Sequence, residues 1–252
     1  MVKKVMATYL AVTCLLTTSS VFASDSEDAI QQKIAEANQE MQEALKSVPK
    51  EKLEAAKKEL ESSQKTYEEF LRKEVRVDPV KVAEALRLKF NDPNITAEDA
   101  KNLGALGFPP NHHTRGDIFI TWDSKTVYRH GHAGIGSKSE RLTVEALPDG
   151  GVQYQSRSKW PSDMKKWAAY LVSGAKSDEY QTAANWAEHS VGKDYSIAYL
   201  NKWRTDAYYC SSLVWRSWYN QGHDLDYDGG GAVTPPDIDK SEKAIAYYTK
   251  GF

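Results

Sequence analysis

The sequence contains very little cysteine. Only Cys14 and Cys210 occur among its 252 residues. Cys14 lies in an apolar stretch near the N-terminus, and if that stretch is removed, the mature chain keeps Cys210 alone and has no internal disulfide. A lone thiol in an exported protein is reactive, paired with another molecule, or buried and inert. The role of Cys210 is therefore the first question that the sequence raises.

An excess of charge of one sign is also absent. The chain has 33 Lys and Arg against 35 Asp and Glu, a formal net charge of -2. This balance argues against nucleic acid or an anionic membrane surface as the main partner. Hydrophobic residues make up 40% of the chain, which is enough to build a core.

Long hydrophobic runs are missing too. This absence decides how the apolar stretch near the N-terminus is interpreted. The apolar stretch Val5–Leu16 follows Lys3 and Lys4 and is too short for a stable membrane anchor. Val21-Phe22-Ala23 supplies the small residues that signal peptidase needs, so we expect cleavage after Ala23. Residues 1–23 are thus predicted to be a signal peptide, which makes the protein secreted or cell-envelope, without a transmembrane anchor after cleavage. An uncleaved anchor and a lipoprotein cut before Cys14 remain as alternatives.

Residues 24–110 are predicted to form an N-terminal helical region. Residues 24–75 are rich in Glu, Lys, Gln and Ala, with apolar residues at helical spacing, which indicates two amphipathic helices that act as a solvated spacer or bind a partner. Val80–Phe90 predicts a third helix, and Thr96 with Asp99 is typical of a cap that opens a fourth. Pro109-Pro110 marks the expected end of this region.

Residues 111–252 show a different pattern and are expected to form an α+β catalytic domain. Hydrophobic alternation predicts strands, and Pro148–Gly151 predicts a hairpin turn between two of them. The expected strands are Gly116–Trp122, Val127–Ile135, Leu142–Leu147 and Gly151–Gln155. The expected helices are 161–175, 179–191, Cys210–Tyr219 and, after a turn-rich segment, Ser241–Tyr248.

Two of these strands carry a histidine and a carboxylate that could form a pair. If the connection 136–141 closes a symmetric turn, Ile135 pairs with Leu142 and His132 lies directly opposite Glu145. A carboxylate there would orient the imidazole and stabilise its charged form. A solvated strand residue remains the alternative for Glu145, and a slip by one residue would break the pairing.

The predicted helix Cys210–Tyr219 begins at the lone thiol. A helix N-terminus favours the thiolate, and a neighbouring imidazolium favours it further. The backbone N–H groups of Cys210 and Ser211 have no intrahelical acceptor there and could bind an oxyanion. Cys210, His132 and Glu145 are therefore the candidate catalytic set, with a buried core thiol as the alternative for Cys210.

Metal binding receives little support from the sequence. The histidines at 112, 113 and 130 occur without the HExxH or CxxC spacing of zinc sites. The run Asp224–Gly229 matches the opening of a calcium loop, but Pro235 stands where the bidentate Glu should be, which favours an acidic turn. We expect no metal and no cofactor.

Six short motifs, in order, resemble the permuted papain-like hydrolases of the YiiX/YebB type, within the NlpC-type superfamily. They are Gly116-Asp117-Ile118, His132–Ile135, Val144-Glu145-Ala146, Val191–Tyr195 (the family's "GKPY", with Asp194 for proline), Tyr209–Val214 ("CSELV", with Ser212 for Glu) and Thr234–Asp237 ("TPDD"). The histidine precedes the cysteine, the order opposite to papain.

This resemblance implies a permuted papain-like domain that hydrolyses an amide or ester through a cysteine thioester. Its substrates would be cell-wall peptides, with peptidoglycan as one source, or amino-acid or lipid amides. Because lecithin retinol acyltransferase is a similar permuted relative, lipid acyl transfer remains an alternative. The other alternative is a binding module that has lost its catalytic turnover.

Overall fold

The structure is a computed structural model that describes residues 69, 72, 74–105, 113–123, 131–196 and 201–252. The predicted signal peptide, the Pro109-Pro110 boundary and all but a few residues of the two helices predicted within residues 24–75 lie outside the described residues. The chain divides into two compact units, residues 1–69 with 126–129, and residues 70–125 with 130–252. The second unit holds the sheet and the motifs discussed above.

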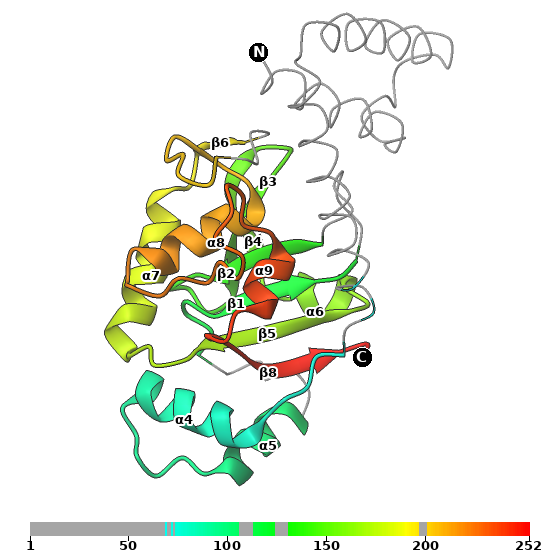
Figure 1. Cartoon of the computed structure of the whole chain (residues 1–252), viewed down its shortest axis with the longest axis vertical. Helices are drawn as coiled ribbons and strands as arrows, with labels where there is room; N and C mark the ends of the chain where they lie inside the picture. Colours follow the sequence, from blue (N-terminus) through cyan, green and yellow to red (C-terminus); the bar gives the residue numbers. More distant parts are fainter. Residues whose placement is uncertain (1–68, 70–71, 73, 106–112, 124–130, 197–200) are drawn as a thin grey trace, which may run out of the picture. The chain divides into compact units, whose positions relative to one another are not determined.

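A six-stranded antiparallel sheet forms the centre of this second unit, in the order β4-β3-β2-β1-β5-β8 (Figure 1). Its strands are β1 (Ile118–Thr121), β2 (His132–Gly136), β3 (Leu142–Leu147), β4 (Gly151–Ser156), β5 (Trp167–Val172) and β8 (Ala244–Lys250). A separate parallel pair consists of β6 (Asp194–Tyr195) and β7 (Ala207–Tyr208). The α+β class and the four strands predicted near the middle of the chain are confirmed, except that residues 127–130 lie outside the described part.

Two helices cover the sheet near its centre. α7 (Ser177–His189) and α8 (Cys210–Tyr219) contact each other and β2, and α8 also contacts β3 (Figure 1). Leu213, Val214 and Trp218 of α8 are fully buried, because the apolar residues of this helix recur on the face that meets the sheet. The packing brings the first turn of α8 next to the strand that carries His132.

Two predicted helices are wrong. The range 161–175 holds the end of the short α6 (Lys159–Asp163) and then the strand β5. This strand pairs with both β1 and β8. Every residue of β5 is buried, and a continuous apolar run of this kind does not distinguish a fully buried strand from a helix. The C-terminal segment likewise contains α9 (Pro235–Lys240) and then β8, where a helix over 241–248 was expected.

The helices before the sheet are confirmed at α4 (Pro79–Phe90) and α5 (Ala97–Ala105). The predicted cap is present, since the backbone N–H of Asp99 donates to Thr96 Oγ1 at 3.1 Å and the backbone N–H of Thr96 donates to Asp99 Oδ2 at 2.9 Å. Both helices contact β8 (Figure 1).

A buried ion pair joins α4 to the start of β1. Lys89 Nζ lies 2.6 Å from Asp117 Oδ1 and donates to the His113 carbonyl at 2.5 Å, while Tyr247 donates its hydroxyl to Asp117 Oδ2 at 2.9 Å. Burial lowers the pKa of Lys89 although Asp117 favours its charged form. The helices α4 and α5 therefore belong to the same compact unit as the sheet. The domain boundary predicted at residue 110 stays a prediction.

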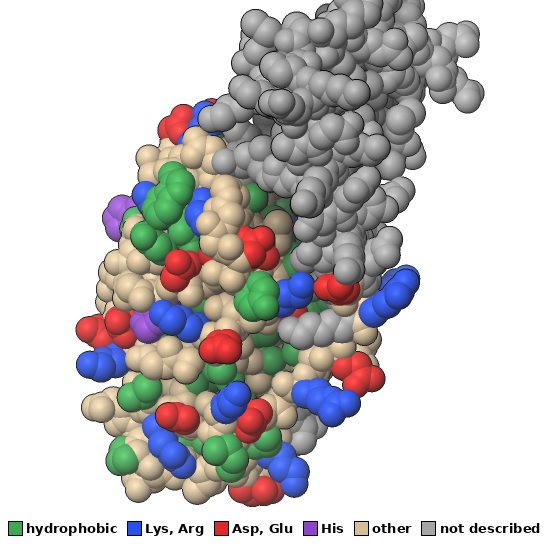
Figure 2. Space-filling view, viewed as in Figure 1, with side chains coloured by type: hydrophobic (Ala, Val, Ile, Leu, Met, Phe, Trp, Pro, Cys, Tyr) green, Lys and Arg blue, Asp and Glu red, His purple; other side chains and the backbone are tan. Residues whose placement is uncertain are grey.

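Acidic and basic side chains are interspersed over the face seen in Figure 2. This fits the near-even balance of charges in the sequence. Among the residues that the structure describes, none of the helices has the length and apolar character that crossing a membrane requires.

Candidate active site

The pairing of β2 with β3 differs from the predicted register by two residues. Ile135 pairs with Val144, not with Leu142. Continued by one step, this register sets Glu145 opposite Gly134, so that His132 is the diagonal neighbour of Glu145. A shift of two residues leaves every side chain on its predicted face.

His132 and Glu145 nevertheless meet. His132 Nε2 lies 2.7 Å from Glu145 Oε2, and both side chains are largely buried. The glycine at position 134 allows Glu145 to extend to His132, because a Cβ atom at that position would lie 2.9 Å from Glu145 Cγ. The carboxylate thus extends across the space that a side chain at position 134 would fill.

Cys210 completes the set from the first turn of α8. The His132 imidazole is the group that most strongly lowers the pKa of its thiol, and the backbone N–H of Ala133 acts in the same direction. Since Nε2 of His132 faces Glu145, Nδ1 is the nitrogen left for the sulfur. The three residues predicted from the sequence are therefore brought together in the order thiol, imidazole, carboxylate.

The N-terminus of α8 is fixed by hydrogen bonds to its surroundings. The backbone N–H of Tyr209 donates to Ser212 Oγ at 3.0 Å, and the Ser211 hydroxyl donates to the Val233 carbonyl at 2.8 Å. The Val233 N–H in turn donates to the Tyr209 hydroxyl at 3.0 Å. Cys210 therefore sits between two residues whose side chains are both anchored.

The electrostatics of the site favour a thiolate and an imidazolium. Burial opposes the charged form of His132, but the hydrogen bonds and charges of Cys210 and Glu145 outweigh it and raise the pKa of His132 to about 10. Burial alone would raise the pKa of the Cys210 thiol, yet the hydrogen bond and charge of His132 lower it. The same imidazole lowers the pKa of the buried Glu145 carboxyl against the opposing effect of burial. The pKa shifts of all three groups therefore favour their charged forms, in which a thiolate can act as a nucleophile and an imidazolium as a proton donor.

The expected oxyanion donors occupy the first turn of α8. Cys210 and Ser211 are its first two residues, where an α-helix has no preceding carbonyl to accept their N–H groups. This is the position that the oxyanion hypothesis requires. It remains a prediction, since no carbonyl substrate is bound.

Two further contacts to Glu145 were missed by the sequence analysis. Thr143 donates its hydroxyl to Glu145 Oε1 at 2.5 Å, and the indole N–H of Trp160 donates to the same oxygen at 3.1 Å. Thr143 precedes Glu145 by two residues on one strand face, so its proximity follows from strand alternation. Trp160 lies on α6, and no local pattern links that helix to Glu145.

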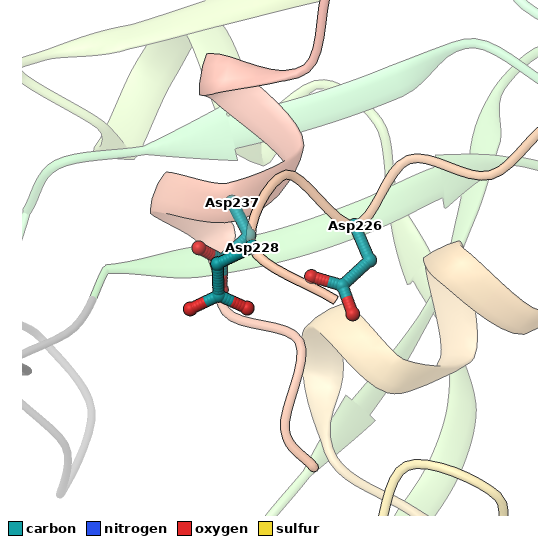
Figure 3. Close-up of side chains that lie close together, drawn as sticks. All are labelled: Asp226, Asp228 and Asp237. Carbon is teal, nitrogen blue, oxygen red and sulfur yellow. The ribbon is translucent and has the colours of Figure 1, made fainter. Parts of the chain in front are cut away.

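The other titratable groups singled out in the sequence lie apart from this set. His113 pairs with Glu140, whereas residues 112 and 130 lie outside the described part of the chain. Asp226 and Asp228 come together with Asp237 at the start of α9, with carboxylate oxygens within 4.8 Å of one another (Figure 3). Asp224 accepts a hydrogen bond from the Trp215 indole at 2.9 Å.

Partners within the chain hold the three clustered aspartates. Lys202 pairs with Asp226, the Gly230 N–H donates to Asp228 at 2.9 Å, and the Thr234 N–H donates to Asp237 at 2.7 Å. These contacts fit a turn-forming acidic loop, and since the three carboxylates could also hold a metal ion, the acidic turn stays a prediction.

The fold and the order of His132 before Cys210 are those expected of a permuted papain-like domain. Residues 111–227 match the model of a family described as "Permuted papain-like amidase enzyme, YaeF/YiiX, C92 family". Over these residues the chain is similar to that family, which confirms the resemblance seen in the motifs.

A curated relative carries the same likeness. The chain is 32% identical over 142 residues to "Uncharacterized protein YycO" of Bacillus subtilis (strain 168). The match covers 54% of this chain and 56% of that protein, so the chain spans about half the length of this relative.

Proposed function

We propose that the protein is a cysteine hydrolase that cleaves an amide or ester bond through a thioester on Cys210. The observation that carries the proposal is the hydrogen bond of His132 to Glu145, together with the lowered pKa that His132 gives to the Cys210 thiol at the first turn of α8. The description of the matching family as an amidase supports an amide as the bond that is cut.

In the first half of the reaction, the Cys210 thiolate attacks the carbonyl carbon and a C–S bond forms. The negative charge that develops on the carbonyl oxygen is stabilised by the N–H groups of Cys210 and Ser211. The His132 imidazolium then gives its proton to the leaving nitrogen or oxygen, and the C–N or C–O bond breaks. The product of this half is an acyl thioester.

In the second half, neutral His132 takes a proton from water as the water oxygen attacks the thioester carbonyl. Collapse of the tetrahedral intermediate breaks the C–S bond, releases the acid and returns the thiolate and imidazolium. Glu145 orients the ring throughout and stabilises its charged form.

A mass shift on the thiol would test this mechanism directly. Incubation with peptidoglycan fragments, or with amino-acid and lipid amides, should give an acyl adduct at Cys210 that hydroxylamine removes. Cys210→Ala should form no adduct and show no turnover while keeping its circular dichroism spectrum. Turnover near the wild-type level in that variant would refute the mechanism.

Two further experiments separate the hydrolase from the alternatives. An acyltransferase would place the acyl group on an added amine or alcohol, whereas a hydrolase releases free acid in the presence of either acceptor. A silent binding module would be alkylated by iodoacetamide at neutral pH no faster than an ordinary thiol.

For substrate and location, we propose action on cell-wall peptides outside the cytoplasm. The support is the export-type N-terminus, with Lys3 and Lys4 before a short apolar stretch and Ala23 at the expected cut. N-terminal sequencing of the exported protein should start at Ser24. Retention of the full-length chain in the cytoplasm would refute the proposed location.

A further inference from the structure

The Glu145 carboxylate has two oxygens with different tasks. Oε2 faces His132, and Oε1 accepts from both the Thr143 hydroxyl at 2.5 Å and the Trp160 indole at 3.1 Å. The series from thiol to carboxylate therefore does not end at Glu145 but continues to two further donors.

Trp160 makes a second contact with the same machinery. Its ring lies nearly parallel to the His132 imidazole, with 15° between the planes and 6.0 Å between centroids. Trp160 is 1% exposed. One side chain thus both donates to the carboxylate and covers the ring that the carboxylate orients.

From these contacts we propose that Trp160 and Thr143 are positioning residues, which hold Glu145 so that its free oxygen is directed at His132 and keep water from that hydrogen bond. The inference rests on the proposed function and extends it by two residues that hydrogen-bond to the orienting carboxylate. Neither residue carries the chemistry itself.

The need for these donors follows from the burial of Glu145. A carboxylate taken out of water must have its lone pairs satisfied, or it becomes protonated and loses its charge. His132 satisfies one oxygen only. Both Thr143 and Trp160 lower the pKa of Glu145 against the effect of burial, so without them the carboxyl would become protonated at a higher pH and free to rotate.

Trp160 is itself held firmly on α6. Its ring contacts Phe119 at 5.3 Å and Trp167 at 6.0 Å between centroids. Lys250 on β8 donates to the carbonyls of Pro161 and Met164, at 2.7 and 3.1 Å. The ring contacts hold the indole and the Lys250 hydrogen bonds hold α6, as a positioning role requires.

The test compares the pH dependence of iodoacetamide alkylation at Cys210, which needs no substrate. Trp160→Phe keeps an aromatic ring and removes the N–H, and Thr143→Val keeps the shape and removes the hydroxyl. Each should move the onset of alkylation upward by about half a pH unit or more, and kcat on the amide substrate should fall with KM unchanged. Thr143→Ser, which restores a hydroxyl, should recover the wild-type onset.

Trp215→Phe is the matched control, because it removes a buried indole N–H that donates to a different carboxylate, Asp224, at 2.9 Å. It should lower the melting temperature and leave the alkylation onset in place. If Trp160→Phe and Thr143→Val alkylate with the wild-type pH profile, the positioning roles are wrong. If the wild type itself alkylates only near the ordinary thiol pKa of about 8.5, the proposed function fails first and the inference with it.

Discussion

Gly134→Ala tests whether the empty space beside Glu145 is what allows the carboxylate to reach His132. The added Cβ would lie 2.9 Å from Glu145 Cγ, 3.3 Å from Glu145 Cδ and 3.1 Å from Trp160 Cζ2. Ordinary contacts of this kind begin at 3.4 Å, so the carboxylate must retreat by about half an ångström. Gly134 has no positive φ, so alanine brings no backbone strain.

The expected effect is on chemistry more than on folding. Misplacement by about 1 Å can cost about 100-fold in rate, so a displacement half as large should reduce kcat by about tenfold or more. Overpacking of a buried site costs about 1–3 kcal/mol of stability, which should leave the protein folded. The assay is steady-state hydrolysis together with urea unfolding.

Gly136 provides the contrast on the same strand. A Cβ there would lie 1.7 Å from the Thr114 carbonyl oxygen, a rigid backbone atom that cannot retreat. Gly136→Ala should therefore reduce stability much more than Gly134→Ala does. Wild-type kcat in Gly134→Ala, with the variant folded, would refute the reasoning that the carboxylate reaches through this space.

Further predictions concern the charges. The His132 imidazolium donates the proton, and its pKa is raised to about 10. Activity should therefore persist through mildly alkaline pH and fall only as the pH approaches that value. A fall near pH 7 would contradict the pairing of His132 with Cys210 and Glu145. Glu145→Gln removes the negative charge beside His132, so the alkaline loss of activity should begin at a lower pH, alkylation of Cys210 should begin at a higher pH, and turnover should slow. An unchanged pH profile would show that another group supports His132. Lys89→Ala leaves Asp117 buried without its cation, which should cost about 3–5 kcal/mol in urea unfolding, and a loss below about 1 kcal/mol would show that α4 is dispensable.

The sequence predicted which residues come together better than it predicted the strand register that unites them. Alternation within β2 and β3 was enough to put His132 and Glu145 on one face, and a register error of two residues does not change the face. The register itself depends on the turn after Gly136. There the Ser137 N–H donates to the Leu142 carbonyl at 3.1 Å, and the Leu142 N–H to the Ser139 carbonyl at 2.8 Å, contacts that composition does not specify.

What could not be predicted depends on contacts between distant segments. Trp160 contacts Glu145 because α6 packs beside the sheet, and nothing near position 160 indicates this. The ion pair of Lys89 with Asp117 joins two residues that are 28 positions apart in the sequence. It links α4 to the sheet within one compact unit. Trp167–Val172 read as helical since an apolar run buried on both faces shows no period of two.

The base and its orienting carboxylate lie 13 residues apart on one hairpin, whereas the thiol joins them from a helix much further along the chain. Local pairings close small loops and form readily, while the docking of α8 closes a large one. The thiol gains its activating neighbour only at that later step. A partly folded chain would accordingly carry a cysteine with only the reactivity of an ordinary thiol, and the fall of the thiol pKa would mark completion of folding.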